Sequence, residues 1–146
     1  STAVRLACRY SQHHVWCNRG VNGIEGSVST AVGFAAGTSA KVFLVTGDLS
    51  FFYDQNALWN QNLSGNLRII ILNDHHGAIF DHLKGLAASP VAATYVCGTH
   101  SANAKGICEQ NDIGYISARN EDEMHTGIVT LLTEETHRPM ALEVFF

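Results

Sequence analysis

The chain has 146 residues, enough for one domain with a substantial hydrophobic core. Its formal net charge is −4 and no segment concentrates Lys and Arg, so composition gives no support to nucleic-acid binding. No apolar run approaches the roughly 20 residues of a membrane span, and the four cysteines show no CxxC spacing, so we expect no membrane span, reduced thiols and a cytoplasmic location.

The predicted elements alternate between helices and strands. In chain order we expect a helix over 1–10, a strand over 13–18, a helix over 27–37, a strand over 40–47, a helix over 48–60 capped by Asp48 or Ser50, and a strand over 66–73. An irregular segment over 81–100 precedes a helix over 101–111, a strand over 113–118, a helix over 120–135 and a strand over 138–146. Continuously apolar strands between helices predict an α/β fold, with an open, mostly parallel sheet and helices on both faces.

Two apolar runs stop at polar residues in the same way. The stretch LVTGDLS ends one predicted strand at Gly47 and Asp48, and IIILNDHHGAIF ends the next at Asn73 and Asp74. Ligands of open α/β folds bind at the carboxyl ends of the strands. If these strands are neighbours, the two carboxylates converge there, and a divalent cation such as Mg²⁺ bound to a phosphate ester would relieve their repulsion. The alternatives are a helix cap for Asp48 and an ordinary polar turn for Asp74.

Both stretches resemble the cofactor motif of thiamine diphosphate enzymes, in which GD and a later Asn or Asp hold Mg²⁺ against the diphosphate. The neighbouring segments are similar to one family of that superfamily, the 2-succinyl-5-enolpyruvyl-6-hydroxy-3-cyclohexene-1-carboxylate synthases of menaquinone biosynthesis. They are NRGVNGIEG (18–26), STAVGFAAG (29–37), GDLSFFYDQNALW (47–59), GAIF (77–80) and the SxxxR pattern at 1–5. The resemblance implies a thiamine diphosphate-binding fold over 1–146, as the C-terminal domain of a longer chain.

The resemblance also implies an activity. The family consists of transferases that decarboxylate 2-oxoglutarate and join the resulting carbanion to isochorismate, with thiamine diphosphate and Mg²⁺ as cofactors. The full-length protein is expected to be a homo-oligomer, a dimer or a tetramer. In this superfamily the glutamate that activates the cofactor comes from an N-terminal domain of a partner subunit. We therefore expect no catalytic residue within 1–146 and no activity of the isolated chain.

Individual residues receive expected roles from the same resemblance. Mg²⁺ would be held by Asp48, Asp74 and the main-chain carbonyl of His76. The other expected contacts are to the cofactor, at Gly47, Leu49, Ser50, Ile24 and Ile79, and to the substrates, at Ser1, Arg5, Arg19, Phe80 and Leu83. Ile24 would keep the cofactor bent, and the arginines suit bidentate binding of the substrate carboxylates.

The NDHHG stretch departs from the family, which usually carries asparagines and glycines there. Asp74 adds a negative charge beside a diphosphate, while His75 and His76 add bulk and permit another metal such as Zn²⁺. Two other functions stay open. One is a different thiamine diphosphate-dependent 2-oxo acid decarboxylase or carboligase. The other is a non-catalytic α/β module that binds a nucleotide or a metal through Asp74, His75 and His76.

Overall fold

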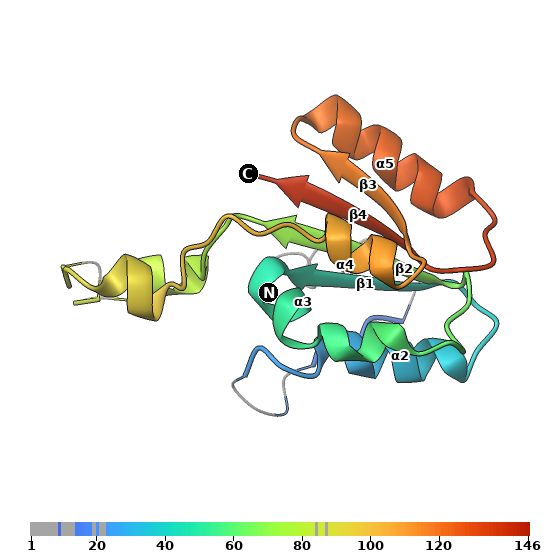
Figure 1. The fold of residues 1–146 in the computed structure, drawn as a ribbon, viewed down its shortest axis with the longest axis horizontal. Helices are drawn as coiled ribbons and strands as arrows, with labels where there is room; N and C mark the ends of the chain where they lie inside the picture. The colour runs from blue at the N-terminus through green and yellow to red at the C-terminus, as the bar shows by residue number, and fades with distance from the viewer. Residues whose placement is uncertain (1–8, 10–13, 19, 21–22, 84, 87) are drawn as a thin grey trace.

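A parallel β-sheet forms the centre of the computed structural model, which describes residues 9, 14–18, 20, 23–83, 85–86 and 88–146. The strands are β1 (Val42–Gly47), β2 (Leu67–Asn73), β3 (Gly114–Ala118) and β4 (Met140–Phe145). Their order is β1-β2-β4-β3, and every neighbouring pair is parallel (Figure 1). The predicted α/β fold is confirmed, and the carboxyl ends of all four strands lie at one edge of the sheet.

Helices lie on both faces of this sheet. They are α2 (Ser27–Ala36), α3 (Asp48–Tyr53), α4 (Lys105–Gln110) and α5 (Glu121–Thr133), with three short turns, η1 (Gln55–Trp59), η2 (Ala78–His82) and η3 (Ala92–Val96). On one face, Val28 of α2 and Cys108 of α4 are buried in a cluster with Ile69 of β2. On the other face, Leu131 of α5 packs in a second cluster with Leu142 of β4.

The face under α5 is only half covered. Helix α5 lies over β3 and β4 (Figure 1). On the β1 side of the same face, the side chains of Phe43, Val45 and Leu72 are 41%, 49% and 37% exposed. The expectation of helices on both faces is therefore right for β3 and β4, whereas no helix among the described residues covers β1 on this face.

Two predicted elements differ at the amino-terminal side. Residues 14–18 form no strand. Instead, the ring of Trp16 lies 4.9 Å from the ring of Phe34 on α2, so this segment packs against a helix and not against the sheet edge. The helix predicted over 1–10 lies outside the described residues, apart from Arg9.

The helix predicted over 48–60 is interrupted at Asp54. The carboxylate of Asp54 accepts hydrogen bonds from the main-chain N and the Oγ of Ser29, at 2.7 and 2.9 Å. The chain then continues as the 3-10 turn η1. A bond between segments 25 residues apart thus ends α3 early, which the local sequence could not show.

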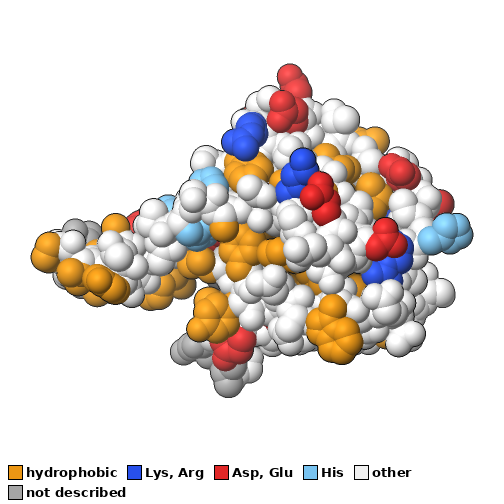
Figure 2. Space-filling view, viewed as in Figure 1, with side chains coloured by type: hydrophobic (Ala, Val, Ile, Leu, Met, Phe, Trp, Pro, Cys, Tyr) orange, Lys and Arg blue, Asp and Glu red, His pale blue; other side chains and the backbone are white. Residues whose placement is uncertain are grey.

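Between β2 and α4 the chain leaves the body of the sheet as a projecting segment (Figure 1). Apart from η2 and η3 it is irregular, as predicted for 81–100. Figure 2 shows hydrophobic side chains gathered on this projection. Elsewhere, the three cysteines that the structure describes, Cys17, Cys97 and Cys108, form no disulfide with one another. No helix in the described part of the chain combines the length and the apolar composition needed to cross a membrane.

Candidate functional site at the carboxyl edge of the sheet

The two polar stretches singled out in the sequence meet at the carboxyl edge of the sheet. Strands β1 and β2 are parallel neighbours, and Gly47 pairs with Leu72, so Asp48 and Asp74 follow the ends of adjacent strands. Asp48 is only 3% exposed. Its Oδ2 accepts a hydrogen bond from the main-chain N of His75, at 3.0 Å. The carboxylate after one strand therefore binds directly to the turn after the next.

Neither Asp48 nor Ser50 caps α3, so that expectation is wrong. The helix begins at Asp48 itself, the residue before it is Gly47, and no side chain makes a capping hydrogen bond. The Oδ1 of Asp48 accepts from the N of Leu49 at 2.7 Å, while Oδ2 faces the neighbouring turn. Gly47, the residue at the N-cap position, has no side chain to cap α3, and Asp48 binds only the N of Leu49 among the first amide groups of the helix.

The turn after β2 holds an uncommon backbone conformation. His75 has a φ of 65°, in the left-handed region that costs a non-glycine residue roughly 1–2 kcal/mol. Its main-chain N donates to Asn73 Oδ1 as well as to Asp48, each at 3.0 Å, and its carbonyl accepts from the N of His100, also at 3.0 Å. The surrounding hydrogen bonds thus hold the turn in its strained form, as is common at binding sites.

The imidazole of His76 is engaged on the side of the projecting segment. Its Nδ1 lies 2.8 Å from the carbonyl oxygen of Asp74, and its Nε2 lies 2.8 Å from Oδ2 of Asp81. The bond to the Asp74 carbonyl, followed by that to Asp81, raises the pKa of His76 to about 9. Both ring nitrogens already have partners, which leaves the main-chain carbonyl as the group of His76 that could bind Mg²⁺. That carbonyl accepts from the N of Ala78, at 3.1 Å.

His100, which the sequence did not single out, lies at this edge beside His75. The Nε2 of His100 lies 3.1 Å from Asp48 Oδ2, and its ring lies 5.6 Å from that of His75. His75 also stacks on Phe145, with the ring centres 5.7 Å apart. Its Nδ1 is buried and has no hydrogen-bond partner among the described residues. Nothing in the local sequence GTHSAN marks His100, because the contact depends on how the projecting segment returns to the sheet.

The apolar residues expected at the site are largely exposed. Ile24, Ile79 and Leu83 are 41%, 70% and 46% exposed, and Phe80 is half-buried in η2. Ile79 and Leu83 belong to the projecting segment, so they are free to contact a ligand or another surface. Ser1, Arg5 and Arg19 lie outside the described residues.

The groups at this edge fit Mg²⁺ with a diphosphate. The candidate ligands are the carboxylates of Asp48 and Asp74 and the carbonyl of His76, all hard oxygen donors. A Cβ placed at Gly47 would meet nothing within 4 Å, so the main chain there is open to a ligand. Among the described residues, no three His, Cys, Asp or Glu side chains are arranged to hold a metal ion.

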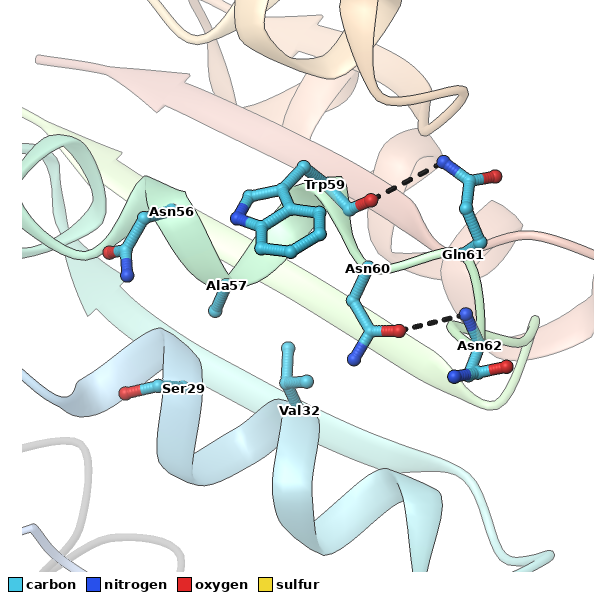
Figure 3. A pocket seen from close by; sticks show the side chains of 8 residues that line it. All are labelled: Ser29, Val32, Asn56, Ala57, Trp59, Asn60, Gln61 and Asn62. Carbon is cyan, nitrogen blue, oxygen red and sulfur yellow. Dashed lines mark hydrogen bonds between the residues drawn. The ribbon is translucent and has the colours of Figure 1, made fainter.

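A separate pocket of about 540 Å³ lies between α2 and the segment that follows α3 (Figure 3). It is lined by Ser29, Val32, Asn56, Ala57, Trp59, Asn60, Gln61 and Asn62. Two of its polar groups bind their neighbours, since Gln61 Nε2 donates to the carbonyl of Trp59 and the N of Asn62 donates to Asn60 Oδ1. None of the lining side chains is acidic, basic or a thiol, so this pocket offers no group for acid–base or metal chemistry.

Comparison with known proteins identifies relatives along nearly the whole chain. No protein-family model matches it. A 2-succinyl-5-enolpyruvyl-6-hydroxy-3-cyclohexene-1-carboxylate synthase of Phocaeicola vulgatus is 44% identical over 149 aligned residues, which cover 99% of this chain and 27% of that protein. Synthases with the same description are 45% identical in Bacteroides thetaiotaomicron, with the same coverage, and 43% identical in Christiangramia forsetii over 94% of this chain. The chain spans about a quarter of the length of these curated relatives.

Proposed function

Because this chain belongs to the family of 2-succinyl-5-enolpyruvyl-6-hydroxy-3-cyclohexene-1-carboxylate synthases, we propose that residues 1–146 are the C-terminal cofactor-binding domain of such an enzyme. The full protein decarboxylates 2-oxoglutarate and adds the resulting carbon nucleophile to isochorismate. The observation that carries this proposal is the hydrogen bond, across two parallel strands, between the buried carboxylate of Asp48 and the N of His75. It brings the two halves of the diphosphate motif together at the edge where α/β folds bind ligands.

Asp48, Asp74 and the carbonyl of His76 hold Mg²⁺ in this proposal. Gly47, Leu49 and Ser50 lie where β1 passes into α3, which supports the proposal that their main-chain groups bind diphosphate oxygens. When bound, thiamine diphosphate supplies the carbon that attacks the 2-oxo acid and the ring system that stabilises the charge left by CO₂. The two carboxylates, left without a cation, would repel each other and the diphosphate.

The remaining residues bind the organic parts of cofactor and substrates. Ile24 and Ile79 contact the cofactor, and their exposure leaves them available for this contact. The substrate contacts are Ser1, Arg5, Arg19, Phe80 and Leu83. Both substrates are carboxylates, which guanidinium groups bind well.

The full-length enzyme works as a homo-oligomer, a dimer or a tetramer, in the cytosol. The glutamate that activates the cofactor lies on another domain of a partner subunit. The isolated 146-residue chain is therefore inactive, because it lacks that acid.

Turnover by the full-length protein tests this proposal. We would supply Mg²⁺, thiamine diphosphate and 2-oxoglutarate, with and without isochorismate, and follow CO₂ release and the coupled product. We expect a product that depends on isochorismate. CO₂ release that ignores isochorismate would instead indicate another 2-oxo acid decarboxylase or carboligase.

Two buried aspartates give a matched pair for the same assay. Asp48→Asn removes a cation ligand, and we expect it to abolish turnover. Asp54→Asn changes another buried carboxylate, which binds Ser29 and lies outside the carboxyl-edge turn, so we expect it to retain turnover. Equal loss in both variants would contradict the assigned role of Asp48.

A further inference from the structure

A buried carboxylate lies directly behind the carboxyl-edge turn. Glu143 belongs to β4, a strand that is otherwise apolar, and its side chain is completely buried. It pairs in register with Ile71 of the neighbouring β2. A carboxyl group in such a place is costly unless hydrogen bonds satisfy its oxygens, so its partners indicate what it does.

Glu143 accepts hydrogen bonds from three different segments. Its Oε1 accepts from Asn73 Nδ2 at 2.7 Å, and its Oε2 accepts from the hydroxyl of Tyr115 at 2.6 Å. Both oxygens lie close to the N of Ala104, at 3.1 and 3.0 Å. Burial, and then the bond to Glu143, raises the pKa of Tyr115, which keeps its hydroxyl protonated as the donor.

The contact with Glu143 decides which way the amide of Asn73 faces. The Nδ2 of Asn73 donates to Glu143 and also to the carbonyl of Ala102, at 3.1 Å. Because the nitrogen side is held there, the oxygen side faces the turn, and Oδ1 accepts from the N of His75 at 3.0 Å. A flipped amide would present NH₂ to an N–H donor and would lose this bond.

The same N–H of His75 binds Asp48, so a continuous chain of hydrogen bonds runs from Glu143 through Asn73 to Asp48. The turn that it fixes contains the strained residue His75 and carries both Asp74 and the carbonyl of His76. A strained turn keeps its form only when its surroundings over-determine it.

We propose that Glu143 is a positioning residue for the cation and diphosphate site, acting through Asn73 on the 74–76 turn. This inference rests on the proposed function, because it takes Asp48, Asp74 and His76 as the groups that hold Mg²⁺. Partners that orient metal ligands from behind typically change metal affinity by about 10- to 100-fold when they are removed.

If Glu143 had a purely structural role, its loss would lower stability without a specific loss of cofactor affinity. Arg68 serves as the control for that case. Arg68 is also a completely buried charged residue of the sheet, but it lies at the opposite, amino end of β2. Among the described residues, its hydrogen bonds go to Leu131, Glu134 and Thr136, and none of these partners lies at the carboxyl edge. Its loss should lower stability and leave the cation site in place.

Titration calorimetry of the full-length protein with thiamine diphosphate, at fixed Mg²⁺ and without substrate, tests the inference. Glu143→Gln places an NH₂ group against donors, and we expect it to raise the Kd by about 10- to 100-fold. Tyr115→Phe, which removes a single donor to Glu143, should raise the Kd in the same direction by a smaller factor. Arg68→Met, compared at a temperature at which all variants are folded, should bind as the unmodified protein does.

A second readout separates positioning from chemistry. The Mg²⁺ concentration needed for half-maximal turnover should rise in Glu143→Gln, whereas kcat at saturating Mg²⁺ and cofactor should stay close to that of the unmodified protein. If Glu143→Gln does not fold, Tyr115→Phe decides the question by the same two measurements.

Two results would overturn the inference. One is an unchanged Kd for thiamine diphosphate in both Tyr115→Phe and Glu143→Gln. The other is a rise in Kd in Arg68→Met as large as that in Glu143→Gln, when the two variants have lost the same amount of Tm. In either case thiamine diphosphate still binds the unmodified protein, so the proposed function stands. Failure of the unmodified protein to bind the cofactor would contradict the proposed function itself.

Discussion

Arg68 links the amino end of β2 to the end of α5. Its Nε donates to the carbonyl of Leu131 at 3.0 Å, and its Nη2 donates to the carbonyl of Glu134 at 2.7 Å. The last carbonyls of a helix have no partner within the helix, so these bonds supply donors to carbonyls at the end of α5 that the helix itself leaves unpaired. Burial lowers the pKa of Arg68. The guanidinium nevertheless stays charged at neutral pH, because its ordinary pKa is far above 7.

Replacing Arg68 with Met should lower the free energy of unfolding by about 2–4 kcal/mol, because the helix-end carbonyls lose their donors. Lys41→Met is the matched control. Lys41 also donates to a carbonyl at the end of α5, that of Leu132, and pairs with the exposed carboxylate of Glu135. Surface pairs of this kind contribute up to about 1 kcal/mol. Chemical denaturation of both variants measures the difference. Equal losses in the free energy of unfolding would show that the burial of Arg68 does not increase its contribution to stability.

The residues of the carboxyl edge were predictable to different degrees. Asp48 and Asp74 follow apolar runs in the sequence, and the parallel pairing of β1 and β2 does place them at one edge. Glu143 was missed, although a single carboxylate inside the strand MALEVF was the available signal. His100 carried no signal, because its contact with Asp48 joins residues 52 positions apart.

At the scale of elements, the approach of α5 to β4 depends on one glycine. A Cβ at Gly127 would come within 2.6 Å of Leu142 Cδ1 and 3.0 Å of its Cδ2. Leu142 is completely buried, so its side chain has little room to move away. The small residue allows the helix to lie close over the sheet.

Gly127→Ala should therefore lower the free energy of unfolding by about 1–3 kcal/mol, as overpacking of a core does. Gly33→Ala provides the opposite case in another helix. A Cβ at Gly33 would meet nothing within 4 Å, so this change should stabilise α2 by up to about 1 kcal/mol through helix propensity. Thermal unfolding of the two variants should give Tm shifts of opposite sign. A rise in Tm for Gly127→Ala would show that α5 can shift without cost.

Elements with a strong local pattern were predicted well, and those fixed by distant contacts were not. The apolar runs of the four strands gave their positions to within two residues, since burial on both sides of a parallel strand leaves a clear sequence signal. Helix α5 begins as expected at its acidic first turn, after Asn120, whose side chain accepts from the N of Glu123. The predicted strand over 13–18 failed, because apolar residues there pack on α2.

At the scale of the whole molecule, two apolar surfaces remain open. One is the uncovered β1 side of the sheet, with Phe43, Val45 and Leu72. The other is the projecting segment, where Ile79 and Tyr95 are 70% and 79% exposed. Contiguous apolar surfaces of this kind mark contacts with other protein surfaces. The proposed function predicts that these surfaces are covered by the rest of the chain and by partner subunits.

The isolated 146-residue chain should therefore bind a hydrophobic dye such as anilinonaphthalene sulfonate more strongly, per mole, than the full-length protein does. Circular dichroism and a cooperative thermal transition are needed first, to establish that the isolated chain is folded. Equal dye fluorescence from the two proteins would show that these surfaces stay exposed in the longer chain.

The central claim is that the carboxyl edge binds thiamine diphosphate through Mg²⁺ and Asp48. Titration calorimetry of the full-length protein, with Mg²⁺ present or removed by EDTA, tests it most directly. We predict saturable binding of thiamine diphosphate that requires Mg²⁺ and is lost in Asp48→Asn but kept in Asp54→Asn. Cofactor binding that persists in both EDTA and Asp48→Asn, or metal binding that does not depend on thiamine diphosphate, would contradict this account of the site.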